Sequence, residues 1–125
     1  MIDPAQVVYY PVYWDLAHRF FEESWEDICG ISYPTIINKH RLGFPAVSTS
    51  STHHSPLRYG DIVHCQIRVS KVGNSSTEWS YSFADQTGRL VWTGEVTTVC
   101  VNLDTFETTE IPSSFRDALR TYSEN

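Results

Sequence analysis

The sequence predicts a single α+β domain in which one long helix is followed by a run of antiparallel strands. Up to Gly43 the apolar residues recur with the 3.6-residue period of a helix, and after it they alternate with period 2 for about sixty residues. With 125 residues and 41% hydrophobic content, the chain is long enough for one core and too short for two. We therefore treat residues 1–125 as one domain.

The first predicted element is a helix over residues 11–27. Pro11 suits the first helical turn, where no amide hydrogen is needed, and Gly30 is typical of the position after a helix. The apolar residues with the i, i+3, i+4, i+7 spacing of one buried face are Tyr13, Leu16, Ala17, Phe20, Phe21 and Trp25. A second, shorter helix is expected from Ser32 to about His40.

Four strands are expected next, over residues 44–54, 63–70, 79–83 and 90–103. The connections at 72–76 and 85–88 are short and rich in turn formers, so the last three strands should form an antiparallel meander. A final helix is predicted from about Pro112, with Phe115, Leu119 and Tyr122 on one side. Four strands and one long helix leave part of the sheet's apolar face uncovered.

The charge and the cysteines limit the possible partners. Nine Lys and Arg against 15 Asp and Glu give a net charge of −6, which opposes binding to nucleic acid or to an anionic membrane. No apolar run approaches the ~18 residues of a membrane span, and no secretion signal is evident. Cys29, Cys65 and Cys100 are odd in number and lack C-x-x-C spacing, which favours a reducing compartment. We expect a cytoplasmic protein.

Two histidine-containing pairs are candidate chemical sites. His53 and His54, like His64 and Cys65, are adjacent on predicted strands, so their side chains should point to opposite faces. Neither pair can then chelate a metal in the usual way, nor can His64 activate Cys65 as a nucleophile. No Gly-rich phosphate loop is present. We therefore expect no metal and no cofactor.

Two stretches, "DPAQVVYYPVYWDLAHRFFEE" and "SPLRYGD", resemble the hotdog-fold acyl-CoA thioesterases, in particular the 4-hydroxybenzoyl-CoA thioesterase-like branch. The similarity extends more loosely to "EIPSSF" at residues 110–115. The matching positions are Asp3, Val7, Val8, Tyr9, Tyr10 and Tyr13 in the first stretch and Pro56, Tyr59, Gly60 and Asp61 in the second. The resemblance implies a hotdog fold, with the long helix packed on a curved antiparallel sheet and protomers joined edge to edge as a homodimer or homotetramer. It also implies a strand before Asp3, and since only Met1 and Ile2 precede Asp3, we expect that strand to be truncated.

The resemblance also implies a site at the start of the long helix. Asp3 takes the role of the catalytic carboxylate, as a general base or as a nucleophile, and the backbone amide of Tyr10 takes the role of oxyanion donor. Gln6 stands where the family most often has Gly, and its side-chain amide is expected near the thioester. Coenzyme A enters as part of the substrate, and its phosphates require basic residues, for which Arg58 and Arg89 are the chosen candidates. Lys71, Arg116 and Arg120 are the other candidates.

The function that follows is hydrolysis of an aromatic or medium-size acyl-CoA, of hydroxybenzoyl-CoA type, to free acid and CoA. From the residues alone, Asp3 before Pro4 is also typical of a turn, and an acidic residue near a helix start is favoured without any catalysis. The alternatives are a hotdog module that binds acyl-CoA or assembles without turnover, and an acyl-thioester hydratase or dehydratase. The hydroxyl-rich segment 43–54 either lines an acyl pocket or faces solvent or a partner protomer.

Overall fold

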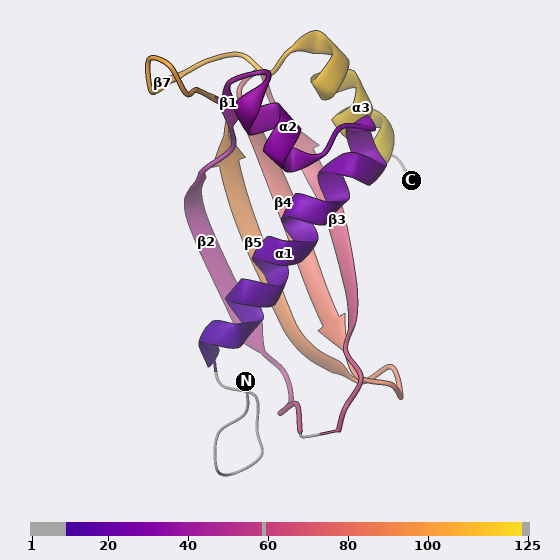
Figure 1. Ribbon diagram of the computed structural model, residues 1–125. Helices are drawn as coiled ribbons and strands as arrows, with labels where there is room; N and C mark the ends of the chain where they lie inside the picture. The colour runs from indigo at the N-terminus through magenta and orange to yellow at the C-terminus, as the bar shows by residue number, and fades with distance from the viewer. Residues whose placement is uncertain (1–9, 59, 124–125) are drawn as a thin grey trace.

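A four-stranded antiparallel sheet curves around one long helix (Figure 1). The computed structural model describes residues 10–58 and 60–123. The helices are α1 (Tyr10–Cys29), α2 (Tyr33–Asn38) and α3 (Ser113–Ser123). The strands are β1 (Leu42–Gly43), β2 (Ala46–His53), β3 (His64–Val72), β4 (Ser76–Ala84), β5 (Leu90–Val99), β6 (Val101–Asn102) and β7 (Glu107–Thr108). The α+β class and the long helix on a curved sheet are confirmed.

The main sheet has the strand order β2-β5-β4-β3, so the last three of its strands form the predicted meander. In its centre Tyr81 of β4 pairs with Gly94 of β5 and with Ile67 of β3. A Cβ atom at position 94 would lie 2.4 Å from Cη2 of Trp92. Glycine is therefore required at this position because the buried Trp92 ring occupies the space above it.

The strand predicted over residues 90–103 is wrong in one respect, because it is interrupted at Cys100. The Cys100 amide donates to the Ser75 carbonyl at 2.7 Å, and the Cys100 carbonyl accepts from the Thr109 amide at 2.8 Å. These bonds take Cys100 out of the ladder with β2 and β4. The next two residues, β6, pair instead with β1 and β7 in a small second sheet.

The core is aromatic and lies between α1 and the concave face of the sheet. The predicted apolar face of α1 is confirmed by its buried residues, which are Tyr13, Ala17, Phe21 and Trp25. Ring centroids lie 5.0 Å apart for Phe21 and Trp79 and 4.5 Å apart for Trp25 and Phe44. Complete burial of such a ring stabilises the fold by about 1.5–3 kcal/mol, so this face fixes α1 on the sheet.

The ends of the helices have identifiable causes. After α1 the chain turns at Gly30, whose φ of 71° is left-handed and whose amide donates to the Glu26 carbonyl at 2.9 Å. Ser32 caps α2 by accepting from the Thr35 amide. In α3, Phe115 and Leu119 are buried as predicted, and the Tyr122 hydroxyl donates to the Ile67 carbonyl at 3.0 Å.

The N-terminal end of α1 lies at the same end of the sheet as the β2–β3 connection and the β4–β5 turn, whereas α3 lies at the opposite end (Figure 1). Tyr13, in the first turn of α1, hydrogen-bonds to the backbone of Leu57 in the β2–β3 connection. This bond ties the start of the helix to the loops around it.

Candidate active site

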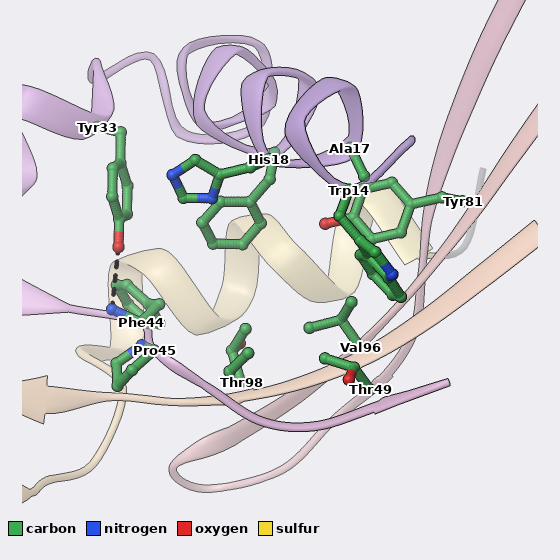
Figure 2. Close-up of a pocket in the computed structure, with 12 residues that line it drawn as sticks. Trp14, Ala17, His18, Tyr33, Phe44, Pro45, Thr49, Tyr81, Val96 and Thr98 are labelled. Atoms are coloured by element: carbon green, nitrogen blue, oxygen red, sulfur yellow. Dashed lines mark hydrogen bonds between the residues drawn. The ribbon is translucent and has the colours of Figure 1, made fainter. Parts of the chain in front are cut away.

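A cavity of about 360 Å³ lies between α1 and the β2 side of the sheet. Its lining is mainly apolar and aromatic (Figure 2). The helix contributes Trp14, Ala17, His18 and Phe21, and the sheet contributes Ala46, Thr49, Tyr81, Val96 and Thr98. Its remaining lining residues are Tyr33, Phe44 and Pro45. Since His18, Pro45 and Thr49 are also exposed to solvent, the cavity opens along the β2 edge.

The volume of the cavity beneath α1 depends on the small side chain of Ala17. This residue is 2% exposed and lies between Trp14 and Phe21 on the same helical face. A larger side chain at this position would project into the cavity. The spacing of one small residue among large aromatic ones therefore creates a binding space rather than a filled core.

The first turn of α1 comes just before the part of the helix that lines the cavity, which begins at Trp14. The first four amides of a helix have no intrahelical acceptor, and Pro11 has no amide hydrogen, so Tyr10, Val12 and Tyr13 supply the donors. No acidic residue occurs in the first turn, Tyr10-Pro11-Val12-Tyr13, to offset the positive end of the helix dipole. Trp14 follows Tyr10 by four residues, which is ~6 Å along the axis. This arrangement can stabilise a negative charge that develops next to a bound apolar group.

The structure shows where some of the predicted site residues lie, and it does not test their roles. Asp3 and Gln6 lie outside the described residues, and Tyr10 is described as the first residue of α1 without its side chain. Arg58 and Arg89 are exposed and lie in the loops at the same end of the sheet as the start of α1. The structure thus brings the two arginines to the helix end where the resemblance places the chemistry.

The two arginines differ in their surroundings. Arg89 Nε pairs with Asp85 Oδ2 at 3.0 Å, and its Nη2 donates to the Pro56 carbonyl at 3.1 Å. The guanidinium of Arg58 makes no ion pair within residues 10–58 and 60–123, and its backbone amide donates to Asp61 Oδ2 at 2.8 Å. Arg58 is therefore the better placed of the two to bind an anionic group.

The β4–β5 turn beside the site is organised by Asp85, which is 4% exposed. Its Oδ1 accepts from the Thr87 hydroxyl at 2.6 Å, the Thr87 amide at 2.9 Å and the Arg89 amide at 3.1 Å. These bonds, with that of the Thr87 hydroxyl foremost, hold the pKa of Asp85 below its ordinary value of 3.8. The ionised form of Asp85 therefore stabilises the folded state.

We expect Asp85→Asn to lower the free energy of unfolding at pH 7, because asparagine accepts the Oδ1 bonds without a negative charge and presents an NH2 group to Arg89 in place of Oδ2. A lowered pKa stabilises the folded state above the pKa of the unfolded side chain, and this contribution is lost as the pH falls through the folded pKa. The difference between wild type and variant should therefore shrink as the pH falls below about 4 in denaturant titrations. Asp104→Asn, at an exposed pair with Arg41, serves as the control. A difference that stays constant down to pH 2 would contradict this role for Asp85.

Sequence reasoning missed most of the cavity. It assigned Ala17 and Phe21 to a core face, and it gave no role to Trp14, His18, Tyr33 or Tyr81. The one useful signal was the segment 43–54, since Phe44, Pro45, Ala46 and Thr49 do line the cavity. Most of β2 is nevertheless exposed, with Val47 at 60%.

The polar groups of the cavity wall are few, and most have partners. The Tyr33 hydroxyl accepts from the Phe44 amide at 3.1 Å (Figure 2), and Thr98 Oγ1 accepts from Trp79 Nε1 at 3.0 Å. At the mouth, His18 Nε2 lies 2.9 Å from Glu22 Oε1. The wall is thus an apolar surface with a small number of fixed polar groups, as is usual for small-molecule sites.

The described residues contain no group of three or more His, Cys, Asp or Glu side chains that could hold a metal ion. Burial raises the pKa of Cys29 to about 11, of Cys65 to about 12 and of Cys100 to about 11. These cysteines are thiols at neutral pH and not activated nucleophiles. Within the described ranges, no helix has the length and apolar character needed to cross a membrane.

Residues 1–119 match the Thioesterase-like superfamily, and the chain therefore belongs to this family. Among solved structures, a gentisyl-coenzyme A thioesterase is 27% identical with a TM-score of 0.83, and the match covers 94% of this chain and 90% of that one. A Staphylococcus aureus protein solved in complex with CoA is 18% identical with a TM-score of 0.90, over 99% of this chain and 77% of that one. No curated protein sequence matches the chain.

A third solved structure, a 1,4-dihydroxy-2-naphthoyl-CoA thioesterase from Synechocystis, is 21% identical with a TM-score of 0.82, over 94% of this chain and 86% of that one. These likenesses confirm the hotdog fold inferred from the sequence. Together with the family, they support thioester hydrolysis as the general class of function.

Proposed function

We propose that the protein is an acyl-CoA thioesterase that hydrolyses an aromatic or medium-size acyl-CoA, of hydroxybenzoyl-CoA type, to free acid and CoA. The observation that carries this proposal is the apolar cavity beneath α1, whose lining begins at Trp14, one turn after the N-terminal amides that have no acceptor within the helix. Its volume of about 360 Å³ falls in the range of small-molecule sites. Its aromatic lining suits a flat acyl group.

In the proposed mechanism, the acyl group lies beneath α1 and the thioester carbonyl oxygen accepts from the Tyr10 amide. Attack on the carbonyl carbon turns this oxygen into an oxyanion, which the amide and the helix dipole stabilise. Asp3 either removes a proton from the attacking water or attacks the carbon itself to form an anhydride that water then hydrolyses. In both routes the C–S bond breaks, and CoA leaves as the thiolate and takes up a proton.

The CoA portion is proposed to run out of the cavity toward the loops at the N-terminal end of α1. Arg58 supplies a guanidinium for a phosphate there, and Arg89 adds positive charge beside it while it holds Pro56 and Asp85. Gln6 is proposed to contribute a side-chain amide near the thioester. Besides the protein, the substrate and water, the proposed chemistry uses no cofactor.

We further propose that the active form is a homodimer or homotetramer. In the described part of the chain, β2 pairs on one side only, with β5, and most of its side chains are exposed. An edge strand of eight residues that no other described element pairs with on its outer side is a template for pairing with another strand. Pairing of β2 with its copy would extend the sheet and narrow the open side of the cavity.

The test is release of free thiol from a panel of acyl-CoAs that includes acetyl-, hexanoyl-, benzoyl- and hydroxybenzoyl-CoA. We expect thiol and acid in equal amounts, with the highest kcat/KM for an aromatic or medium-size acyl group. Binding of the same compounds without thiol release would contradict the enzymatic proposal and favour a binding module. Preference for acetyl-CoA would contradict the proposed substrate class.

A further inference from the structure

Tyr81 is an unusual member of the cavity wall. Its side chain is 4% exposed, and it extends from the centre of β4, where it pairs with Gly94 and Ile67. Figure 2 shows its hydroxyl directed into the space enclosed by the labelled side chains. A buried tyrosine hydroxyl normally has a hydrogen-bond partner. Among the described residues, by contrast, the Tyr81 hydroxyl has no protein partner, and since it is not one of the fully buried unpaired atoms, it is reached from the cavity that Tyr81 lines.

The neighbouring polar groups do not satisfy this hydroxyl. Tyr33 and Thr98 already accept from the Phe44 amide and from Trp79 Nε1, respectively. Burial, with a smaller contribution from Cys65, raises the pKa of Tyr81 far above neutrality. The group is therefore a neutral O–H donor at neutral pH.

The position of Tyr81 determines which part of a ligand it meets. The thioester is proposed to lie at the first turn of α1, whereas Tyr81 lines the cavity together with Ala17 and Val96, farther from that turn. The hydroxyl therefore faces the body of the acyl group and not the reacting carbonyl. A ligand that offers no acceptor at this depth should bind more weakly, because it covers the hydroxyl without forming a hydrogen bond to it.

We propose that Tyr81 is a specificity-determining residue that donates a hydrogen bond to an oxygen substituent on the acyl group bound beneath α1. This role rests on the proposed thioesterase function and refines its substrate class. The enzyme selects acyl groups that carry a hydroxyl or carbonyl oxygen on an otherwise apolar frame. Tyr81 takes no part in bond breaking.

The kinetic test compares wild type with Tyr81→Phe on benzoyl-CoA and on the best of 2-, 3- and 4-hydroxybenzoyl-CoA. We expect the variant to lose about tenfold in kcat/KM on the hydroxylated substrate, the value of one hydrogen bond, and to keep its value on benzoyl-CoA. The control is Tyr122→Phe, because the Tyr122 hydroxyl donates to the Ile67 carbonyl outside the cavity. This variant should leave the ratio of the two kcat/KM values unchanged. Equal losses on both substrates in Tyr81→Phe would overturn the proposal.

Two further measurements test the role of Tyr81 even if the proposed hydrolysis does not occur. If no acyl-CoA is hydrolysed, the affinities of two thioether analogues, with and without a ring hydroxyl, are measured by calorimetry. Tyr81→Phe should then reduce the preference for the hydroxylated analogue about tenfold, and an unchanged preference would overturn the proposal. The thermal midpoint of Tyr81→Phe should equal or exceed that of wild type, because an unpaired hydroxyl is removed. A lower midpoint would indicate a structural hydrogen bond instead.

Discussion

Replacing Asp3 by asparagine is expected to lower kcat on the best acyl-CoA substrate by about 100- to 10,000-fold, the usual contribution of a general acid or base. Asparagine keeps the size of the side chain and its carbonyl oxygen. It cannot take a proton from water at neutral pH or form an anhydride. Since the loss concerns a group that acts in the transition state, KM should change far less than kcat.

The matched control is Asp117→Asn, an exposed aspartate on α3 at the opposite end of the sheet from the start of α1. Initial rates of thiol release should be the same for this variant and for wild type. Equal turnover by wild type and Asp3→Asn would remove Asp3 from the mechanism. A rise in KM alone would show that Asp3 binds substrate and does not act on it.

Replacing Ala17 by leucine is expected to lower kcat/KM on an aromatic acyl-CoA by about 10- to 100-fold. Ala17 is 2% exposed and lines the cavity, so the added carbons occupy space that the acyl ring needs. The expected loss corresponds to the ~1.5–3 kcal/mol gained by burying a ring of this size. Acetyl-CoA, which needs little of the cavity, should be affected much less, so the ratio of the two kcat/KM values is the quantity to measure.

Ala17→Ser, which adds one oxygen atom, is the size control and should retain most of the aromatic activity. Denaturant titration distinguishes a blocked cavity from a misfolded protein. Overpacking of a core typically lowers the free energy of unfolding by about 1–3 kcal/mol and leaves the fold intact. If Ala17→Leu is folded and still hydrolyses aromatic and acetyl substrates in the wild-type ratio, the acyl group does not occupy this cavity.

The elements of the fold were predictable because their signals are local. The buried face of α1 follows from the spacing of Tyr13, Ala17, Phe21 and Trp25, and the meander follows from short connections rich in turn residues. The end of β5 was not predictable, because the bonds of Cys100 to Ser75 and Thr109 join segments that are distant along the chain. The residues on both sides of Cys100 favour strands, and this preference does not show which distant backbone groups Cys100 will bond to.

The candidate site was less accessible from the sequence. The resemblance supplied Asp3 and Tyr10, and positive charge alone supplied Arg58 and Arg89. Charge could not show that Arg89 is engaged by Asp85 and Pro56 while Arg58 has no ion pair among the described residues. Likewise, alternation along β4 predicts that Tyr81 faces inward. The cavity next to Ala17 could not be predicted, because its walls come from segments that are distant along the chain.

In the proposed complex, the acyl group lies beneath α1 with its carbonyl oxygen at the first turn of the helix. The most direct measurement is a crystal structure with a thioether analogue of hydroxybenzoyl-CoA, in which a methylene group between sulfur and carbonyl prevents hydrolysis. We expect the ring against Trp14, Ala17 and Tyr81 and the carbonyl oxygen about 3 Å from the Tyr10 amide nitrogen. An analogue bound with its ring outside this cavity, or with its carbonyl away from the α1 N-terminus, would contradict this placement.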